Sequence, residues 1–129
     1  MPKYLHPDVL DQGNALIRSN TQRIVVMRNY TAGMAYATVV SNVIASSAAT
    51  SADFTLADQG TLGRKCTSTS RLSTAATATS VSGDNLHFAL LDDSNSRVLA
   101  VADESTNQVV TIGNIVTIPA LTFNANQPT

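Results

Sequence analysis

Short apolar segments separated by turn residues dominate the second half of the chain. Residues 60–123 form a series of Thr-, Val- and Ala-rich segments parted by Gly, Asn, Asp and Ser. Within residues 86–91, the side chains of Leu86, Phe88 and Leu90 alternate with those of their neighbours. Because successive side chains of a strand point to opposite faces, this alternation predicts a β-strand with these three residues on one face.

Other strands are predicted by the same reasoning. The apolar run Ile24–Met27 lies inside Arg23–Arg28 and is typical of a strand that is buried on both faces. Phe54 and Leu56 point the same way in a further short strand. Additional strands are expected at Arg64–Ser70, Thr74–Ser82 and Val98–Ala102.

The end of the chain contains a hairpin signal. Val109–Ile112 and Ile115–Phe123 flank Gly113-Asn114, a dipeptide that favours a two-residue hairpin turn. Pro119 lies within the second of these segments and donates no ladder hydrogen bond, so we expect a strand edge or a bulge there. The polar tail, residues 124–129, is expected to be flexible.

The middle of the chain is less regular. Met34–Ala37 has the composition of a helical turn, and Thr38–Ala45 that of a strand. Ser46–Ser51 consists of small residues and is expected to be a loop.

These patterns together predict a mostly β protein. Seven or eight short strands at close spacing indicate a jelly-roll-like β-sandwich. The length of 129 residues is that of one domain, so we take residues 1–129 as a single β-sandwich domain.

One helix is expected before the first strand, over His6–Asn20. Pro7 suits the first helical position, where a missing N–H costs nothing. Asp8 near the start and Arg18 near the end complement the helix dipole. Apolar residues fall on one face at helical spacing: Val9, Leu10, Leu16 and Ile17. The helix is expected to pack on its own sheet, with docking on a partner as the alternative.

Composition restricts the core and the partners. Aromatic residues make up 5% and Trp is absent, while Ala, Thr and Ser are the most frequent residues. Small side chains bury little apolar area each, so we expect a thin sandwich that gains stability from association. Charged residues make up 13% and the net charge is −1, which argues against nucleic-acid binding. A polar, weakly charged surface suits burial in a larger assembly.

One basic cluster stands out, formed by Arg64, Lys65 and Arg71. Arg64–Ser70 alternates polar and small residues, as an edge or interface strand would. We therefore interpret the cluster as a hairpin edge that is solvated or lies between subunits, with contact to nucleic acid as the alternative.

No set of residues predicts a metal or catalytic site. His6, His87 and Cys66 are too few for a four-ligand zinc site, and a single cysteine forms no internal disulfide. Asp92–Ser96 is rich in oxygen ligands but lacks the glycine and glutamate of an EF-hand, so a solvated turn is expected. The chain lacks a Gly-x-Ser-x-Gly nucleophile elbow, and Gly60–Lys65 does not match the phosphate-loop spacing. We expect no enzyme activity, no cofactor and no metal.

Sugar binding is a further alternative, since sugars stack on exposed aromatic rings. Tyr30 and Tyr36 are the clustered candidates, although packing of their loop against the body is the favoured interpretation. The sequence has no apolar run of the length that spans a membrane. Its N-terminal residues lack the apolar region of a signal peptide, so we expect synthesis in a cytosol.

Several motifs appear in an order that resembles a known family. The quoted segments are Asp11–Met27, the tyrosine-bearing loop after it, Leu62–Thr67, His87–Ala100 and Thr111–Pro119. In this order they resemble small tailed-bacteriophage virion proteins of the capsid cement, or decoration, type. The resemblance covers nearly the whole chain, and the chain departs from it in Tyr30–Ser51.

The resemblance implies a mostly β, jelly-roll-like virion protein without catalytic residues. It implies binding to the major capsid protein on the capsid exterior after synthesis in the host bacterial cytoplasm, and self-association as a homodimer or homotrimer. Candidate interface residues are Val9, Leu16, Tyr30, Tyr36, Arg64, Lys65 and Arg71. A structural protein of the tail, neck or fibre, and a carbohydrate-binding attachment module, remain as alternatives.

Overall fold

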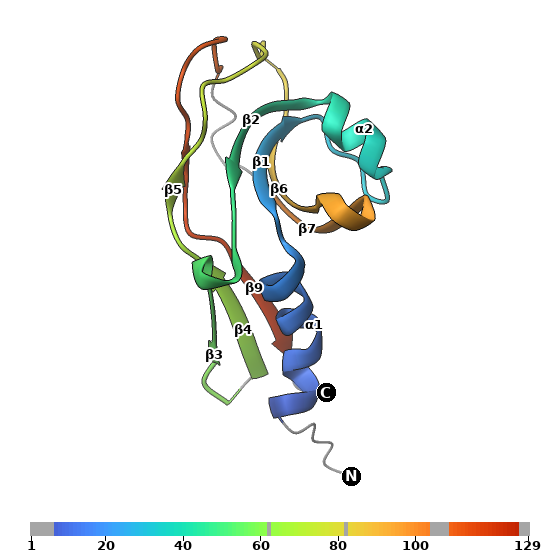
Figure 1. Cartoon of the computed structure of the whole chain (residues 1–129), viewed down its shortest axis with the longest axis vertical. Helices are drawn as coiled ribbons and strands as arrows, with labels where there is room; N and C mark the ends of the chain where they lie inside the picture. Colours follow the sequence, from blue (N-terminus) through green and yellow to red (C-terminus); the bar gives the residue numbers. More distant parts are fainter. Residues whose placement is uncertain (1–6, 62, 82, 104–108, 127–129) are drawn as a thin grey trace.

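A four-stranded antiparallel sheet forms the centre of the molecule. The structure is a computed structural model, and it describes residues 7–61, 63–81, 83–103 and 109–126, with side chains from residue 11 onward. The sheet has the order β2-β1-β6-β7 (Figure 1). Its strands are β1 (Arg23–Arg28), β2 (Val43–Ala48), β6 (Leu86–Asp92) and β7 (Arg97–Asp103).

The other elements surround this sheet. A three-stranded antiparallel sheet has the order β3-β4-β9, and β5 pairs with β8. The bounds of these strands are β3 Phe54–Asp58, β4 Gly63–Ser68, β5 Arg71–Leu72, β8 Thr117–Ile118 and β9 Thr122–Asn126. The helices are α1 (Pro7–Asn20) and α2 (Tyr36–Ser41), with short 3₁₀ turns η1 (Ser51–Asp53) and η2 (Asp93–Asn95).

The mostly β fold with one N-terminal helix is confirmed, and so are several individual strands. The strands expected at Arg23–Arg28 and around Phe54 occur as β1 and β3, and the segments 86–91 and 98–102 lie within β6 and β7. The middle of the chain differs from the expectation. Thr38 and its neighbours belong to α2, and β2 continues to Ala48 through part of the expected loop.

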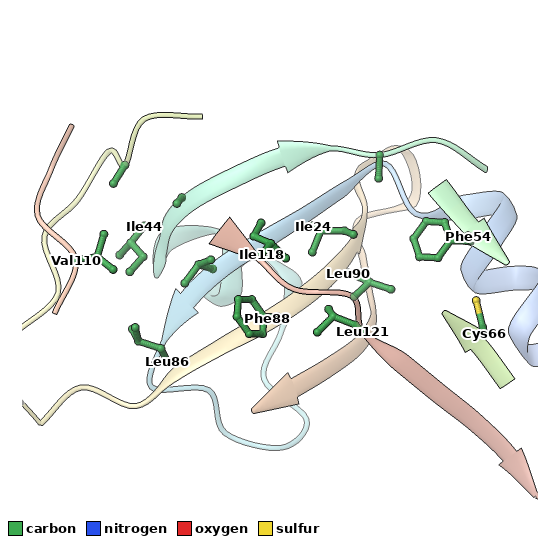
Figure 2. Packing of buried hydrophobic residues seen from close by; sticks show 14 residues of the cluster. Ile24, Ile44, Phe54, Cys66, Leu86, Phe88, Leu90, Val110, Ile118 and Leu121 are labelled. Atoms are coloured by element: carbon green, nitrogen blue, oxygen red, sulfur yellow. The ribbon is translucent and has the colours of Figure 1, made fainter. Parts of the chain in front are cut away.

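Strand β1 is buried on both faces, as its apolar run predicts. Ile24 and Val26 belong to the main apolar cluster, whereas Val25 and Met27 belong to a second cluster on the opposite face. All four side chains are at most 1% exposed. Strand β6 beside it divides in the same way. Leu86, Phe88 and Leu90 belong to the main cluster (Figure 2), and Ala89 and Leu91 belong to the second.

The second cluster is covered by the segment between β1 and β2. Val39 of α2 is fully buried there, and Tyr30, Met34 and Tyr36 pack around it. Helix α2 is therefore the cover of one sheet face, while the opposite face carries the main core.

Two long chain segments pair to cover the main-core face. Strands β4 and β9 pair Gly63 with Asn126 and Thr67 with Thr122. The same register continues beyond the sheet, through hydrogen bonds between Ser68 and Leu121 and through β5 and β8. Further bonds then join Ser73 to Val116, Ala76 to Asn114 and Ser80 to Val110. We call this pair of segments, residues 63–80 and 110–126, the ribbon; it forms the long edge of the molecule in Figure 1.

Hydroxyl groups replace carbonyl groups at four places along the ribbon. The hydroxyl oxygens of Ser68, Ser73, Thr79 and Ser80 accept hydrogen bonds from the backbone N–H groups of Leu121, Val116, Ile112 and Val110, respectively, at 2.7 to 3.0 Å. Ser and Thr side chains compete with backbone groups for such bonds. The ribbon therefore stays paired where its backbone departs from regular strand geometry, and Ser68, Ser73 and Ser80 are buried although polar.

This arrangement explains two wrong predictions. Of the expected strand Thr74–Ser82, the described residues 74–81 contain no regular strand, because hydroxyl bonds replace part of the backbone ladder. Gly113 forms a turn with a bond from Asn114 N–H to Thr111 O, but this turn does not close a hairpin. The partner of residues 110–116 is the distant segment 73–80. At Pro119, where an edge or a bulge was expected, the strand is interrupted between β8 and β9.

A third wrong prediction concerns Arg64–Ser70. The strand there, β4, lies between β3 and β9 and is the central strand of its sheet. Both of its edges are already paired, so it is unable to extend the sheet of a neighbouring molecule.

Helix α1 packs on the three-stranded sheet, as the own-sheet interpretation predicts. It contacts β3, β4 and β9. Ile17 packs against the main core, but the Leu16 side chain is 41% exposed. Arg64 of β4 ties the helix down through a 2.8 Å ion pair with Asp11. The backbone of Val9 lies in α1, and its side chain is outside the described part of the structure.

The hydroxyl bonds of the ribbon predict a specific loss of stability. Replacing Ser80, which is 1% exposed, by Ala leaves the Val110 N–H without its acceptor. A buried unsatisfied donor costs roughly 1–3 kcal/mol, so the Ser80→Ala variant should lose that much free energy of unfolding in urea denaturation.

The matched control is Ser70→Ala, at an exposed position of the same segment. This variant should stay within about 0.5 kcal/mol of the parent protein. Equal, negligible effects of the two substitutions would show that the hydroxyl does not support the ribbon.

Candidate interaction surface

The upper part of the ribbon carries no charge. Residues 72–83 and 105–129 contain no Asp, Glu, Lys or Arg. In the structure the described parts of these two runs lie side by side, joined by the bonds between residues 73–80 and 110–116 (Figure 1). Segments far apart in sequence thus combine into one uncharged surface.

Large apolar side chains are exposed on this surface. Leu72, Val81, Val109, Ile112 and Ile115 are between 56% and 63% exposed. All five lie on the ribbon or at its end, whereas the other two large apolar side chains that are exposed among those the structure describes, Leu16 and Val40, lie on helices. The five side chains are spread along this uncharged pair of segments, and exposed apolar groups on an uncharged surface favour contact with other molecules. We call these five residues the apolar tip.

A cleft adjoins the apolar tip. It has a volume of about 500 Å³ and lies between the four-stranded sheet and the second arm of the ribbon. Val26, Leu86 and Phe88 form its sheet side, and Ile115 and Pro119 belong to its ribbon side. The candidate surface is therefore a ridge of exposed apolar side chains beside a hollow that apolar and polar groups line together.

Charged side chains outside the ribbon tip are largely paired within the molecule. Ion pairs of 2.7 to 2.8 Å join Arg23 to Asp93, Arg64 to Asp11 and Asp58, Arg71 to Asp53, and Arg97 to Asp92. The predicted basic cluster is thus not a free cationic patch, because two of its three members neutralise carboxylates of their own chain. Lys65 lies half-buried on β4, where it pairs in register with Ala57 and Asn124.

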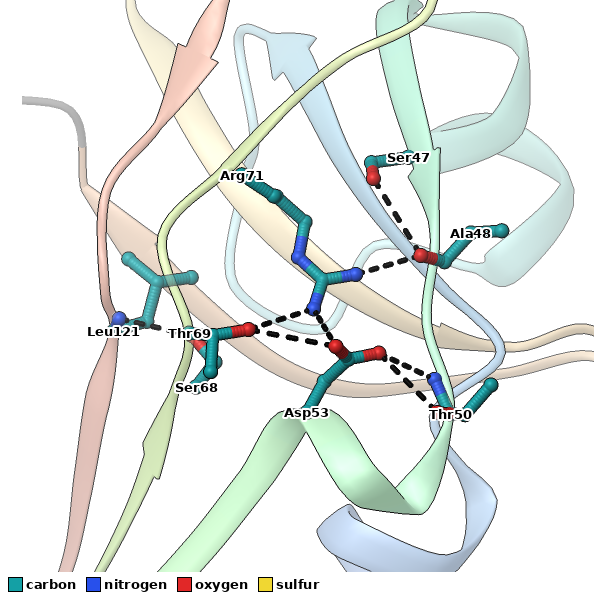
Figure 3. A network of polar contacts seen from close by, with 8 residues as sticks. All are labelled: Ser47, Ala48, Thr50, Asp53, Ser68, Thr69, Arg71 and Leu121. Atoms are coloured by element: carbon teal, nitrogen blue, oxygen red, sulfur yellow. Dashed lines mark hydrogen bonds and ion pairs between the residues drawn. The ribbon is translucent and has the colours of Figure 1, made fainter.

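Arg71 joins the ribbon to the central sheet (Figure 3). Its guanidinium donates to the carbonyl oxygen of Ala48, at the end of β2, and to the Thr69 hydroxyl. It also pairs with Asp53 at 2.7 Å. Burial acts to raise the pKa of Asp53, but bonds from the Thr50 N–H and from Arg71 outweigh it and hold that pKa below its usual value. Arg71 therefore has a structural role in this chain.

The Asp92–Ser96 connection is a turn whose residues Ser94, Asn95 and Ser96 are exposed, as its composition predicts, but its two carboxylates are bonded within the chain. Asp92 is 2% exposed and accepts bonds from Asn95 and Arg97. These bonds hold the pKa of Asp92 below its usual value. Asp93 accepts from Arg23 and from the Tyr36 hydroxyl, the latter at 2.6 Å. The oxygen ligands of this turn are occupied by the chain's own donors.

The two predicted aromatic residues pack inward. Tyr30 and Tyr36 lie against the second apolar cluster, and the ring of Tyr30 is 5.8 Å from that of His87. His87 is also 3.5 Å from Asp103. These contacts agree with the packing interpretation of the tyrosines. Both tyrosine rings are thus used in packing, although each stays partly exposed.

The candidate interface residues of the sequence do not come together in one place. Leu16 is on the helix, Tyr30 and Tyr36 are on the opposite side of the central sheet from the main core, and Arg64 and Arg71 are in separate ion pairs. The surface that does come together is the apolar tip, which the sequence interpretation missed. The available signal was the pair of charge-free runs at residues 72–83 and 105–129.

Reactive and metal-binding groups are sparse in the described ranges. Cys66 is fully buried, and burial raises the pKa of its thiol. Within these ranges, no three His, Cys, Asp or Glu side chains gather in a way that would hold a metal ion. Of the helices that the structure describes, none has the length and apolar character needed to cross a membrane.

The paired carboxylates predict a loss of stability in acid. The pKa values of Asp53, Asp84, Asp92 and Asp93 are held below the usual value in the folded protein. Their contribution to stability is therefore present above the unfolded pKa of about 4 and is lost as the pH falls through the folded values. Urea denaturation between pH 7 and pH 3 should show a constant free energy of unfolding down to about pH 5 and then a fall.

Asp92→Asn should lower the stability at neutral pH and reduce the fall in acid, because Asp92 is buried and paired. Asp58→Asn, at a carboxylate whose side chain is 72% exposed, is the control and should leave the pH profile nearly unchanged. An acid profile that is the same for both variants would contradict the assignment.

Comparison of the chain with protein-family models, with curated proteins and with solved structures gave no match. Functional interpretation therefore depends on the residues themselves. The strongest feature they offer is an uncharged ribbon with an exposed apolar tip, on a body whose charges are mostly paired internally.

Proposed function

We propose that this protein is a structural protein of a tailed-bacteriophage virion, a cement or decoration protein that binds the outer surface of the capsid and stabilises it. Its partners are then the major capsid protein and further copies of itself, and its place is the capsid exterior after synthesis in the host bacterial cytoplasm. A jelly-roll-like sandwich is the finer fold description that goes with this proposal. The proposal rests on the motif resemblance and on the apolar tip.

The apolar tip is the observation that carries the proposal. Docking of an uncharged apolar surface removes apolar area from water without desolvating any charge, and burying an unpaired charge is costly. A protein that must stay attached to a shell benefits from this, because such contacts are insensitive to salt. Placement at many symmetric shell sites further strengthens contacts that are weak individually.

A non-enzymatic role is supported by the use of the polar side chains. The carboxylates whose pKa values are lowered accept bonds from the chain's own donors, chiefly arginines and backbone N–H groups, in positions that brace the fold. The one described thiol is buried with a raised pKa. These groups act as structural supports, which is what a protein that works by contact requires.

Particle stability provides the direct functional test. Virus particles made with and without the protein are heated or exposed to chelator and low salt, and the release of packaged DNA is followed. Particles that carry the protein should retain their DNA at higher temperature. Equal survival of the two particle types would contradict reinforcement, and a copy number that matches a single ring at the neck or tail would contradict the shell location.

A pair of substitutions tests the contact surface. Ile112→Asp and Ile115→Asp place a charge on side chains that are 61% and 62% exposed, so the isolated fold should be unaffected. Each should weaken binding to particles that lack the protein by roughly tenfold or more, because a buried interface position would then hold an unpaired charge. Binding is measured by co-sedimentation with the particles.

Val40→Asp is the matched control for these variants. Val40 is 37% exposed on α2, away from the ribbon, and this substitution should leave binding unchanged. If Val40→Asp weakened binding and the two ribbon variants did not, the contact surface would lie on the α2 side and the assignment to the apolar tip would be wrong.

A further inference from the structure

The segment between β1 and β2 is fastened to the body of the molecule at its two ends. At its start, the N–H of Asn29 donates to the carbonyl oxygen of Asn85, and at its end the carbonyl oxygen of Asn42 accepts from the N–H of Arg28. Among residues 30–42, between these anchors, Val39 is the one buried residue. We call residues 30–42 the lid, because they cover the second apolar cluster, on the side of the central sheet away from the ribbon (Figure 1).

The helix in the lid has little stability of its own. Helix α2 comprises six residues and begins after Ala35 without a side-chain cap. It has no acidic residue in its first turn and no basic residue in its last turn. Helices this short are unstable in isolation, and this one lacks the charges that would complement its dipole. The helix therefore depends on its contacts with the sheet below it.

The start of the lid has the features of a hinge. Asn29 adopts a φ of +58°, and its side chain holds it there by bonds to the Asp84 carboxylate and the Asn85 N–H. Gly33 follows with a φ of +82°, and no atom lies within 4 Å of the position that a Cβ would occupy. An anchored residue followed by a glycine in open space lets the segment between them absorb a change in backbone angles.

One side-chain group connects the lid to another element. Within the described part of the chain, Tyr36 is the lid residue whose side chain bonds outside the lid, and its hydroxyl donates to Oδ1 of Asp93 at 2.6 Å. Arg23 of β1 holds the same carboxylate in place through bonds of 2.8 and 3.0 Å. The short bond from Tyr36 ends on an ionised group and is therefore stronger than a bond between neutral groups.

We propose that the lid opens as a unit while the three- and four-stranded sheets stay folded, and that the hydrogen bond from Tyr36 to Asp93 is the latch that keeps it closed. Local opening of this kind occurs in segments with few buried contacts. Opening uncovers part of the second apolar cluster, whose members Val25, Met27 and Leu91 are fully buried when the lid is closed. Exposure of apolar area is unfavourable, so the open form is a minor state.

The latch controls access to a second apolar surface. The second cluster and the main core lie on opposite faces of the central sheet, and the apolar tip belongs to the ribbon on the main-core side. Opening of the lid therefore leaves the tip unchanged, and the inference is independent of the proposed capsid function. A closed lid keeps the apolar face beneath it out of contact with other molecules.

Amide hydrogen exchange of the isolated protein at neutral pH measures the opening. The N–H groups of Val39 and Asn42 are bonded within the lid and exchange when α2 unravels, whereas those of β1, a central strand, report on the sheet. After correction for intrinsic rates, the lid amides should exchange more than about tenfold faster than those of β1. Low concentrations of urea should accelerate exchange in β1 more than in the lid, because local opening exposes less surface than global unfolding.

Tyr36→Phe tests the latch. It keeps the ring and removes the hydroxyl, so exchange of the lid amides should become roughly tenfold faster, as expected for the loss of one charge-assisted hydrogen bond at a partly exposed site. Tyr30→Phe is the matched control on the same lid. The Tyr30 hydroxyl has no hydrogen bond to any residue in the described ranges, so this variant should exchange like the parent protein.

Two further variants separate the latch from general loss of stability. In the Asp93→Ala background, Tyr36→Phe should accelerate lid exchange no further, because the acceptor is already gone. Ser80→Ala weakens the ribbon and should accelerate exchange in β1 while leaving the lid amides unchanged. Circular dichroism of each variant verifies that the fold is retained, and if Asp93→Ala does not fold, the two tyrosine variants decide.

Two results would overturn the inference. One is a parent protein whose lid and β1 amides exchange at the same corrected rate and with the same urea dependence, since the lid would then open only with the whole molecule. The other is a Tyr36→Phe variant whose lid amides exchange no faster than those of Tyr30→Phe, since the hydroxyl would then hold nothing closed.

Discussion

The pairing of two distant chain segments into the ribbon is the interaction on which this structure depends. Residues 63–80 and 110–126 together close the main core, supply two strands of the three-stranded sheet and carry the apolar tip. Four of the N–H groups that hold the segments together donate to Ser or Thr hydroxyls. Ser and Thr side chains bury little apolar area, but here their hydroxyl oxygens stabilise the fold as hydrogen-bond acceptors.

The ion pairs complement the ribbon. Arg71 fastens it to the end of β2 and to Asp53, and Arg64 joins its lower end to α1 through Asp11. These arginines are partly or largely buried. Loss of a partner carboxylate would therefore leave a buried charge unpaired, which is costly. As a result, most of the described arginines are paired with carboxylates of the same chain, while the apolar tip exposes uncharged side chains, and this combination suits lasting contact with other proteins.

Local patterns predicted the elements that local physics determines. The alternation in 86–91 and the continuous apolar run in Arg23–Arg28 gave correct strands, because burial on one or both faces leaves a direct mark in the sequence. The hairpin at Gly113-Asn114 and the strand at Thr74–Ser82 were wrong, because the partner of each segment is distant and hydroxyl bonds replace the regular ladder. For the same reason, the apolar tip could not be predicted from the sequence, although its two charge-free runs are visible there. Arg64 and Arg71, which the sequence places in one basic cluster, are paired with carboxylates from other parts of the chain.

The central claim is that the apolar tip is where this protein meets its partner. Amide hydrogen exchange of the protein, free in solution and bound to purified virus particles, tests it most directly. The account predicts slower exchange on binding in residues 109–117, with α2 unchanged. Protection confined to α2, or a profile identical in the two states, would contradict it.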